Sequence, residues 1–162
     1  MGIEIERKFR IVDDQWRQKV EDDDGRRIRQ FYLAVRDGFS LRVRILDEAR
    51  AVMTLKTGAG LSRGEYEYEI PLDEARELEA SRIGRTVEKR RYRVDLGADG
   101  LVVEVDVFEG ALAPLVLAEI ELPAVDHAVE LPDWLGPEVT GEGAYSNSSL
   151  ALAEAPPLPQ QS

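Results

Sequence analysis

The stretch Glu4-Ile5-Glu6-Arg7-Lys8 decides the fold of this chain. In an extended strand successive side chains point to opposite faces, so Glu4, Glu6 and Lys8 share one face and Ile5 lies on the other. Two carboxylates at this spacing repel each other unless a cation lies between them or one is protonated, and hard divalent metals prefer such oxygen ligands. A half-buried strand with a solvated polar face gives the same alternation. The metal interpretation gains weight only because the pattern recurs along the chain.

Polar and apolar residues alternate in seven further segments, which we predict to be strands. These segments are residues 28–35, 40–46, 51–57, 62–70, 86–96, 101–108 and 115–122. The charged polar faces each keep one sign, whereas open solvated sheets usually mix signs between neighbouring strands. The acidic positions are Glu4, Glu6, Glu65, Glu67, Glu69, Glu104, Asp106, Glu119 and Glu121. The basic positions are Lys8, Arg42, Arg44, Lys56, Lys89, Arg91 and Arg93.

These charged faces have a physical consequence if they line a common interior. Like charges about 4 Å apart cost on the order of 4 kcal/mol per pair at an effective dielectric constant near 20, so the interior must hold counter-ions. Acids would hold divalent metal and bases would hold a polyanion. A metal-chelated chain of phosphates satisfies both, since arginine and lysine are the usual phosphate partners. A closed barrel with a polar bore would also remove the edges of this largely antiparallel sheet.

Short helices are expected over residues 12–24, 73–83 and 125–131, with a last one ending at residue 152. The segment 73–83 has the clearest signals, because Pro71 precedes it and Gly84 follows it. We expect this helix to cover the sheet from outside. Tyr32 is either a packed ring or a proton-transfer group, and the residues alone favour packing.

Composition sets limits on the class of protein. The chain has 162 residues, 43% of them hydrophobic, which predicts one domain over residues 1–153 and a disordered tail over 154–162. A net charge of −11 argues against binding to duplex nucleic acid. The absence of cysteine excludes disulfides and thiolate metal sites. Without an apolar run of membrane-spanning length or a signal segment, we expect no membrane association and a cytoplasmic location.

The charged blocks also follow one another in an order that resembles a known family. After the opening stretch come Leu41-Arg42-Val43-Arg44, Thr54-Leu55-Lys56-Thr57-Gly58, residues 63–69, 88–92, 104–108, 118–122 and 138–147. This series resembles the CYTH, or triphosphate tunnel metalloenzyme, family over nearly the whole chain before the tail. The resemblance implies a mainly β (α+β) fold, an eight-stranded antiparallel β-barrel tunnel with a few short helices outside. It also implies a linear triphosphate substrate and a divalent metal, Mg²⁺ or Mn²⁺.

The resemblance assigns roles by motif position. The implied metal ligands are Glu4, Glu6, Asp106, Glu119 and Glu121, with Glu67 or Glu69 assisting. The implied phosphate-binding residues are Lys8, Arg42, Arg44, Lys56, Lys89 and Arg91, and Tyr32 and Lys56 are implied catalytic residues. Two departures stand out: Ser148 and Ser149 occupy positions where relatives often carry a lysine, and no His-Phe pair precedes Glu4 as in the adenylate cyclase branch.

The leading hypothesis is metal-dependent hydrolysis of inorganic tripolyphosphate by a monomer or homodimer. The alternatives are a non-catalytic module that binds polyphosphate or a nucleotide, a class IV-type adenylate cyclase, and a thiamine triphosphatase. An organic group requires an apolar or aromatic wall. Only Trp134 and Tyr145 suggest such a wall, and both are equally typical of a core, so we expect tripolyphosphate to be preferred over nucleoside triphosphates.

Overall fold

The computed structural model describes residues 2–20, 25–58, 63–97 and 100–157, and for residues 2–4 it describes the backbone alone. Within these residues the strands form one antiparallel sheet, in the order β1-β6-β5-β4-β3-β7-β8-β9-β2. The strands are β1 (Gly2–Glu4), β2 (Glu6–Arg10), β3 (Arg26–Arg36), β4 (Phe39–Leu46), β5 (Arg50–Thr57), β6 (Arg63–Ile70), β7 (Ile83–Asp95), β8 (Val102–Phe108) and β9 (Val116–Glu121).

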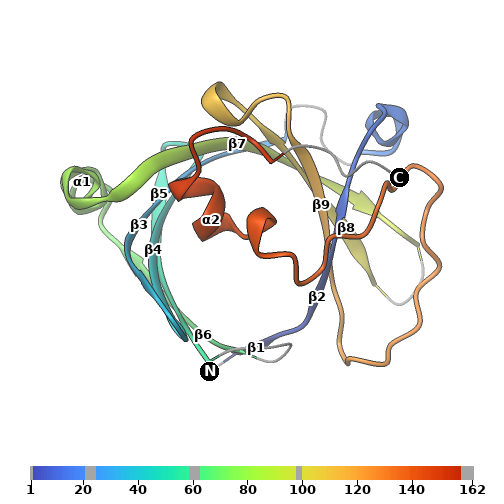
Figure 1. Ribbon diagram of the computed structural model, residues 1–162, viewed down its shortest axis with the longest axis horizontal. Helices are drawn as coiled ribbons and strands as arrows, with labels where there is room; N and C mark the ends of the chain where they lie inside the picture. The colour runs from blue at the N-terminus through green and yellow to red at the C-terminus, as the bar shows by residue number, and fades with distance from the viewer. Residues whose placement is uncertain (1, 21–24, 59–62, 98–99, 158–162) are drawn as a thin grey trace.

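The opening stretch joins the two ends of this sheet. β1 and β2 are separated only by Ile5, yet β1 pairs with β6 and β2 pairs with β9. The backbone oxygen of Ile5 accepts a hydrogen bond from the backbone N–H of Leu122 at 2.8 Å. The sheet therefore curls into a ring that the N-terminal strand closes by changing partner at Ile5 (Figure 1). Counting β1 and β2 as one interrupted strand, the eight-stranded antiparallel barrel is confirmed.

Two of the apolar clusters lie on the outer face of this ring. One contains Phe31, Val43 and Ile45 of the sheet and is covered by Ala75 of helix α1 (Leu72–Leu78), as expected for a helix outside the barrel. The other contains Trp16 and Trp134 together with Phe9, Tyr92, Val94, Val103, Val105, Ala118 and Ile120. Because the outer face buries the apolar side chains, the alternation leaves the inner face to the charged ones.

Helix α2 (Asn147–Leu152) lies within the outline of the ring, which differs from the expected position of the helices (Figure 1). The Ser146 hydroxyl caps it by accepting a hydrogen bond from the backbone N–H of Ser149 at 3.1 Å. Leu150 and Ala151 are buried in an inner cluster with Tyr32, Val87, Leu112, Leu115, Leu117, Phe108, Val139 and Tyr145. The helix packs against β7 and β3, so one part of the interior is apolar and filled.

Three expected helices differ from the structure. Residues 12–24 contain only a 3-10 helix, η1 (Gln15–Lys19), with residues 21–24 outside the described part. Residues 125–131 form a turn and irregular structure, and Pro132 directly after them prevents a helix from continuing. In 73–83, α1 ends at Leu78 and is followed by η2 (Glu79–Ser81). Ile83 already belongs to β7, where it pairs with Tyr32.

The end of the chain is described as far as Pro157, whose backbone oxygen accepts a hydrogen bond from Arg10 at 3.4 Å. The rest of the expected disordered tail, residues 158–162, lies outside the described residues. None of the described helices is long and apolar enough to cross a membrane.

Gly84 lets α2 approach β7, and substitution there should show how much this contact stabilises the fold. Its φ is +66°, and a Cβ would lie 2.4 Å from the backbone oxygen of Ala151. Gly97 is a matched control, since its φ is +83° and a Cβ there meets nothing within 4 Å. Both alanine variants should lose roughly 1–2 kcal/mol from left-handed backbone strain. We expect Gly84→Ala to lose about 2 kcal/mol more in urea unfolding because α2 must shift; equal losses would contradict this packing.

Candidate active site

Two cavities open at opposite ends of the ring. The first, of about 460 Å³, is lined at the start of β3 by Arg26 and at the end of β4 by Leu46. The second, of about 510 Å³, is lined at the other end of β3 by Arg36 and in the β3–β4 turn by Gly38. Since β3 runs from one cavity to the other, the two cavities lie at opposite ends of the ring.

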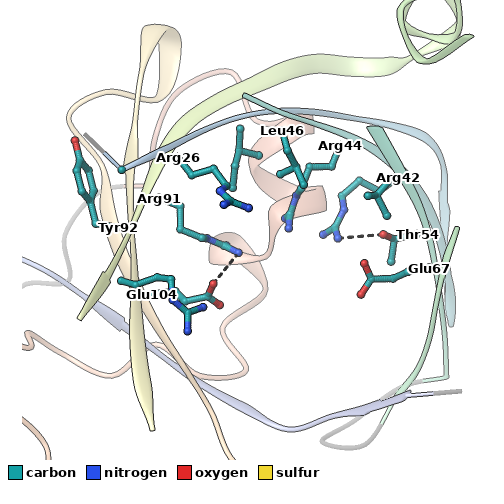
Figure 2. A pocket seen from close by; sticks show the side chains of 13 residues that line it. Arg26, Arg42, Arg44, Leu46, Thr54, Glu67, Arg91, Tyr92 and Glu104 are labelled. Carbon is teal, nitrogen blue, oxygen red and sulfur yellow. Dashed lines mark hydrogen bonds and ion pairs between the residues drawn. The ribbon is translucent and has the colours of Figure 1, made fainter. Parts of the chain in front are cut away.

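The first cavity concentrates positive charge, and we call it the arginine cavity. Its charged lining consists of Arg26, Arg42, Arg44, Arg91 and Arg93 together with Glu67 and Glu104. The labelled arginine side chains converge on it from β3, β4 and β7 (Figure 2). The lining therefore carries a net charge of three positive in a chain whose total is −11. Such local concentration of one sign attracts anions of the opposite sign.

Arg42 and Arg44 are enclosed cations whose hydrogen bonds among the described residues go to neutral side chains. Arg44 Nε donates a hydrogen bond to Gln30 Oε1 at 2.8 Å, and Arg42 Nη2 donates one to Thr54 Oγ1 at 3.4 Å. Within the described residues neither guanidinium forms an ion pair, and Arg42 Nε and Gln30 Nε2 are buried donors without an acceptor. Burial and the charges of Arg42 and Arg91 lower the pKa of Arg44 to about 9. An anion in this cavity would satisfy both guanidiniums.

Asp106 lies in a cationic clamp deeper in the interior. Arg91 grips both of its oxygens, Nε to Oδ1 at 2.7 Å and Nη2 to Oδ2 at 2.9 Å. Lys89 Nζ lies 2.7 Å from Oδ2 and also donates to Asn147 Oδ1 of α2 at 3.2 Å. Burial opposes ionisation of Asp106, but Arg91 and Lys89 outweigh it and hold the Asp106 pKa well below its usual range. Burial lowers the pKa of Lys89 to about 7 despite Asp106.

The contacts within this clamp affect the implied roles of Asp106 as a metal ligand and of Lys89 as a phosphate-binding residue. Both oxygens of Asp106 are engaged by cations, so as they lie they present little room for a metal. Lys89 is fully buried and reaches α2, whereas Arg91 also lies 3.3 Å from Glu104 and lines the arginine cavity. Metal binding by Asp106 and phosphate binding by Lys89 stay predictions.

Carboxylates from β8, β9 and β2 occupy neighbouring strand positions. The register places Glu104 opposite Glu119 and Glu6 opposite Glu121. Like charges directly opposite each other destabilise a sheet unless a cation lies between them. Lys8 supplies one such charge, with Nζ 3.5 Å from Glu119 and donating to the Tyr145 backbone oxygen at 3.0 Å.

We call Glu6, Glu104, Glu119 and Glu121 the acidic corner. The pKa values of Glu119 and Lys8 reflect their pairing there. Burial opposes ionisation of Glu119, but Lys8 and Arg91 lower its pKa to about 2. Burial likewise opposes the charge on Lys8, and Glu119 and Glu6 outweigh it, so the pKa of Lys8 is raised. Glu119 and Lys8 therefore both keep their charges.

A divalent cation fits the chemistry of this donor set, since hard metals take carboxylate oxygens. As the side chains lie, no three acidic or histidine residues in the described part of the chain converge into a ready-made metal site. For Glu4 only the backbone is described, in register with Arg63 of β6. The structure thus brings Glu6, Glu119 and Glu121 together on adjacent strands and puts Glu67 in the arginine cavity.

The two implied catalytic residues lie apart from the arginine cavity lining. Tyr32 is 4% exposed in the inner apolar cluster, which agrees with packing. Lys56 Nζ lies 3.5 Å from Glu65 across the β5–β6 pair. A proton-transfer role for either residue stays a prediction.

Several residues of the candidate site were given no role from the sequence. Glu104 alternates with Asp106 and was available from the same pattern, although the motif did not assign it. Arg26 was missed because the predicted strand began at residue 28. Gln30 and Thr54 are uncharged, so the search for rows of like charge passed over them. Nothing in the sequence indicated that Asn147, a helix-capping candidate, would accept a hydrogen bond from Lys89.

A closed antiparallel ring of strands with arginines and carboxylates on its inner face is the fold of a β-barrel with a charged interior. The sequence model of the CYTH domain matches residues 2–151, and this chain belongs to the CYTH family. Enzymes of this family depend on a divalent metal.

Relatives and a solved structure agree with this assignment. The chain is 41% identical to an inorganic triphosphatase from Acetivibrio thermocellus, over 93% of this chain and 94% of that protein. It is 40% identical to an inorganic triphosphatase from Nitrosomonas europaea, over 93% and 97% of the two chains. The crystal structure of an inorganic triphosphatase superposes with a TM-score of 0.67 at 36% identity, over 96% of this chain and 98% of that one.

Proposed function

We propose that this protein is an inorganic triphosphatase that hydrolyses tripolyphosphate inside its tunnel with a divalent metal. The observation that carries the proposal is the pair of guanidiniums, Arg42 and Arg44, which lie in a positively charged cavity and pair with no carboxylate among the described residues. The inorganic triphosphatases at about 40% identity, which match almost end to end, support the same conclusion.

Two groups of residues have different roles in this proposal, one in phosphate binding and one in metal binding. Arg42, Arg44 and Arg91 bind and orient the phosphates from one side of the bore, because planar guanidiniums match phosphate oxygens in pairs. The carboxylates on β2 and β9 hold Mg²⁺ or Mn²⁺, namely Glu6, Glu119 and Glu121, with Glu4 by motif position. When bound, such a metal neutralises phosphate charge and lowers the pKa of a coordinated water.

The lining of the arginine cavity favours an inorganic substrate over the alternatives with an organic group. Trp134 is buried in the outer core and Tyr145 in the inner cluster, and neither lines this cavity. Tyr92 is the aromatic residue at its rim, and its ring lies away from the guanidiniums (Figure 2). A nucleobase or thiamine would therefore meet arginines and glutamates rather than an aromatic wall.

Phosphate release from purified protein tests the proposal. With tripolyphosphate we expect turnover in Mg²⁺ or Mn²⁺ and none in excess EDTA, because the acidic corner then loses its counter-ion. We also expect kcat/KM for tripolyphosphate to exceed that for ATP and thiamine triphosphate by about tenfold or more, and no cyclic AMP on chromatography.

Four results would contradict it. Full activity in excess EDTA would show that hydrolysis does not require a divalent metal. Cyclic AMP from ATP would make the protein a cyclase, and a preference for thiamine triphosphate would indicate an organic-group site elsewhere. Large thermal stabilisation by tripolyphosphate without any phosphate release would favour the binding module. The cytoplasmic location and the choice between monomer and homodimer stay predictions.

A further inference from the structure

Arg26 places a cation where the sheet would be expected to avoid one. In the β3–β7 register it lies directly opposite Arg91, and like charges directly opposite each other destabilise a sheet. The Arg26 side chain lines the arginine cavity, and its guanidinium points toward the same space as those of Arg44 and Arg91 (Figure 2). Its side chain is 58% exposed, whereas Arg42 is 7% exposed, so Arg26 lies at the mouth and Arg42 deep in the bore.

Asp47 is held beside Arg26 by two hydrogen bonds to the backbone of Arg27. The Asp47 backbone N–H donates to the Arg27 backbone oxygen at 2.9 Å, and Asp47 Oδ1 accepts from the Arg27 backbone N–H at 2.9 Å. Asp47 adopts a positive φ of 52°, an unusual conformation for a residue other than glycine. Its second oxygen, Oδ2, lies 3.5 Å from Arg26 Nε. The turn between β4 and β5 thus fixes a carboxylate next to the mouth.

The Arg26–Asp47 pair is one that a ligand can displace. The pair is long, at 3.5 Å between Arg26 Nε and Asp47 Oδ2, and both side chains are more than half exposed. Exposed pairs of this kind contribute little to stability. A terminal phosphate carries more charge than a carboxylate and offers several acceptor oxygens, so it competes well for the same guanidinium.

We propose that Arg26 forms an outer phosphate position at the mouth of the arginine cavity, and that Asp47 occupies Arg26 in the empty protein and competes with the ligand. This rests on the proposed binding of a phosphate chain in the tunnel. Arg42 and Arg44 hold the inner phosphates, and Arg26 reaches only the outermost one. Arg26 is thereby a specificity-determining residue that distinguishes a chain of three phosphates from a shorter one.

Three variants test the proposal. Arg26→Gln removes the cation, and Asp47→Asn removes the competing charge while keeping the Oδ1 acceptor and a residue type that tolerates positive φ. Arg27→Gln is the matched control, because it removes the same charge from the next residue, whose side chain pairs with Glu88 at 3.8 Å. For each, calorimetric titration with sodium tripolyphosphate and with pyrophosphate gives Kd, and phosphate release gives kcat and KM.

We expect Arg26→Gln to raise Kd and KM for tripolyphosphate about tenfold with kcat within about twofold, and to change the pyrophosphate Kd less. Asp47→Asn should lower the tripolyphosphate Kd by about two- to fivefold, the opposite sign. Arg27→Gln should leave Kd and KM unchanged. Urea unfolding checks that all three variants are folded.

Equal effects of Arg26→Gln and Arg27→Gln would overturn the outer phosphate position. Weaker binding in Asp47→Asn would overturn the competition, because the ion pair would then be structural. If the wild type binds tripolyphosphate without releasing phosphate, the proposed hydrolysis fails while the Kd comparison still decides this inference. If the wild type binds no tripolyphosphate, both proposals fail.

Discussion

Replacing Arg91 by alanine is expected to lower the free energy of unfolding by about 3–5 kcal/mol, because it leaves Asp106 buried with Lys89 as its remaining cation. The same variant should lower tripolyphosphate hydrolysis about a hundredfold or more, since a cavity-lining guanidinium is lost together with the geometry of the clamp. Urea unfolding and phosphate release on the same preparation separate the two losses.

Arg90→Ala is the control for this experiment. Arg90 is adjacent in β7 and its side chain points to the outer face, where its register partners are Val107 and Arg27. The Arg90→Ala substitution removes the same formal charge as Arg91→Ala. Substitutions on the outer surface usually change the free energy of unfolding by less than about 0.5 kcal/mol. Similar losses at Arg90 and Arg91 would mean that the strand register is wrong.

Replacing Arg44 by glutamine is expected to separate activity from stability. Hydrolysis should fall about ten- to a hundredfold, because a charged hydrogen bond to phosphate is worth roughly 1.5–3 kcal/mol. Stability should stay the same or rise, because Arg44 lies near Arg42 and Arg91, which lower its pKa, and its hydrogen bond goes to a neutral amide. Active sites often hold such unfavourable charge for the sake of the ligand.

Arg50→Gln is the charge-matched control for Arg44. Arg50 is 57% exposed and pairs with Glu69 at 3.1 Å on β6. We expect its activity and unfolding free energy to match the wild type. A clear destabilisation by Arg44→Gln would show that Arg44 has a stabilising partner, and the argument for an anion at this position would fail.

Alternation in the sequence predicted the strands and the sign of each inner face, because side-chain direction in a strand depends only on position. Arg42, Arg44 and Glu67 accordingly reach one cavity. Alternation carries no information on distance, so it did not indicate that Asp106 would be bonded by Arg91 rather than open to a metal.

The helical segments were predicted less well, because whether a short segment forms a helix, and where that helix lies, depends on the residues it packs against. Ser146 was a recognisable cap, yet nothing local to it indicated that Leu150 and Ala151 would pack inside the ring. Residues 125–131 had helical composition but lie between two prolines. The predicted strand began at residue 28, two residues too late, so Arg26 was not assigned to a strand face. The proposed outer phosphate position was therefore missed as well.

The change of strand partner at Ile5 has a consequence for the order of folding. Neighbouring hairpins such as β3–β4 and β4–β5 join residues close in the chain, whereas closure pairs Glu6 with Glu121. Contacts of such long sequence separation are entropically demanding and form late. Until they form, the free edges of β6 and β9 can pair with other chains. The segment that contributes Glu6 and Lys8 to the lumen therefore also determines when a nascent chain stops being prone to association.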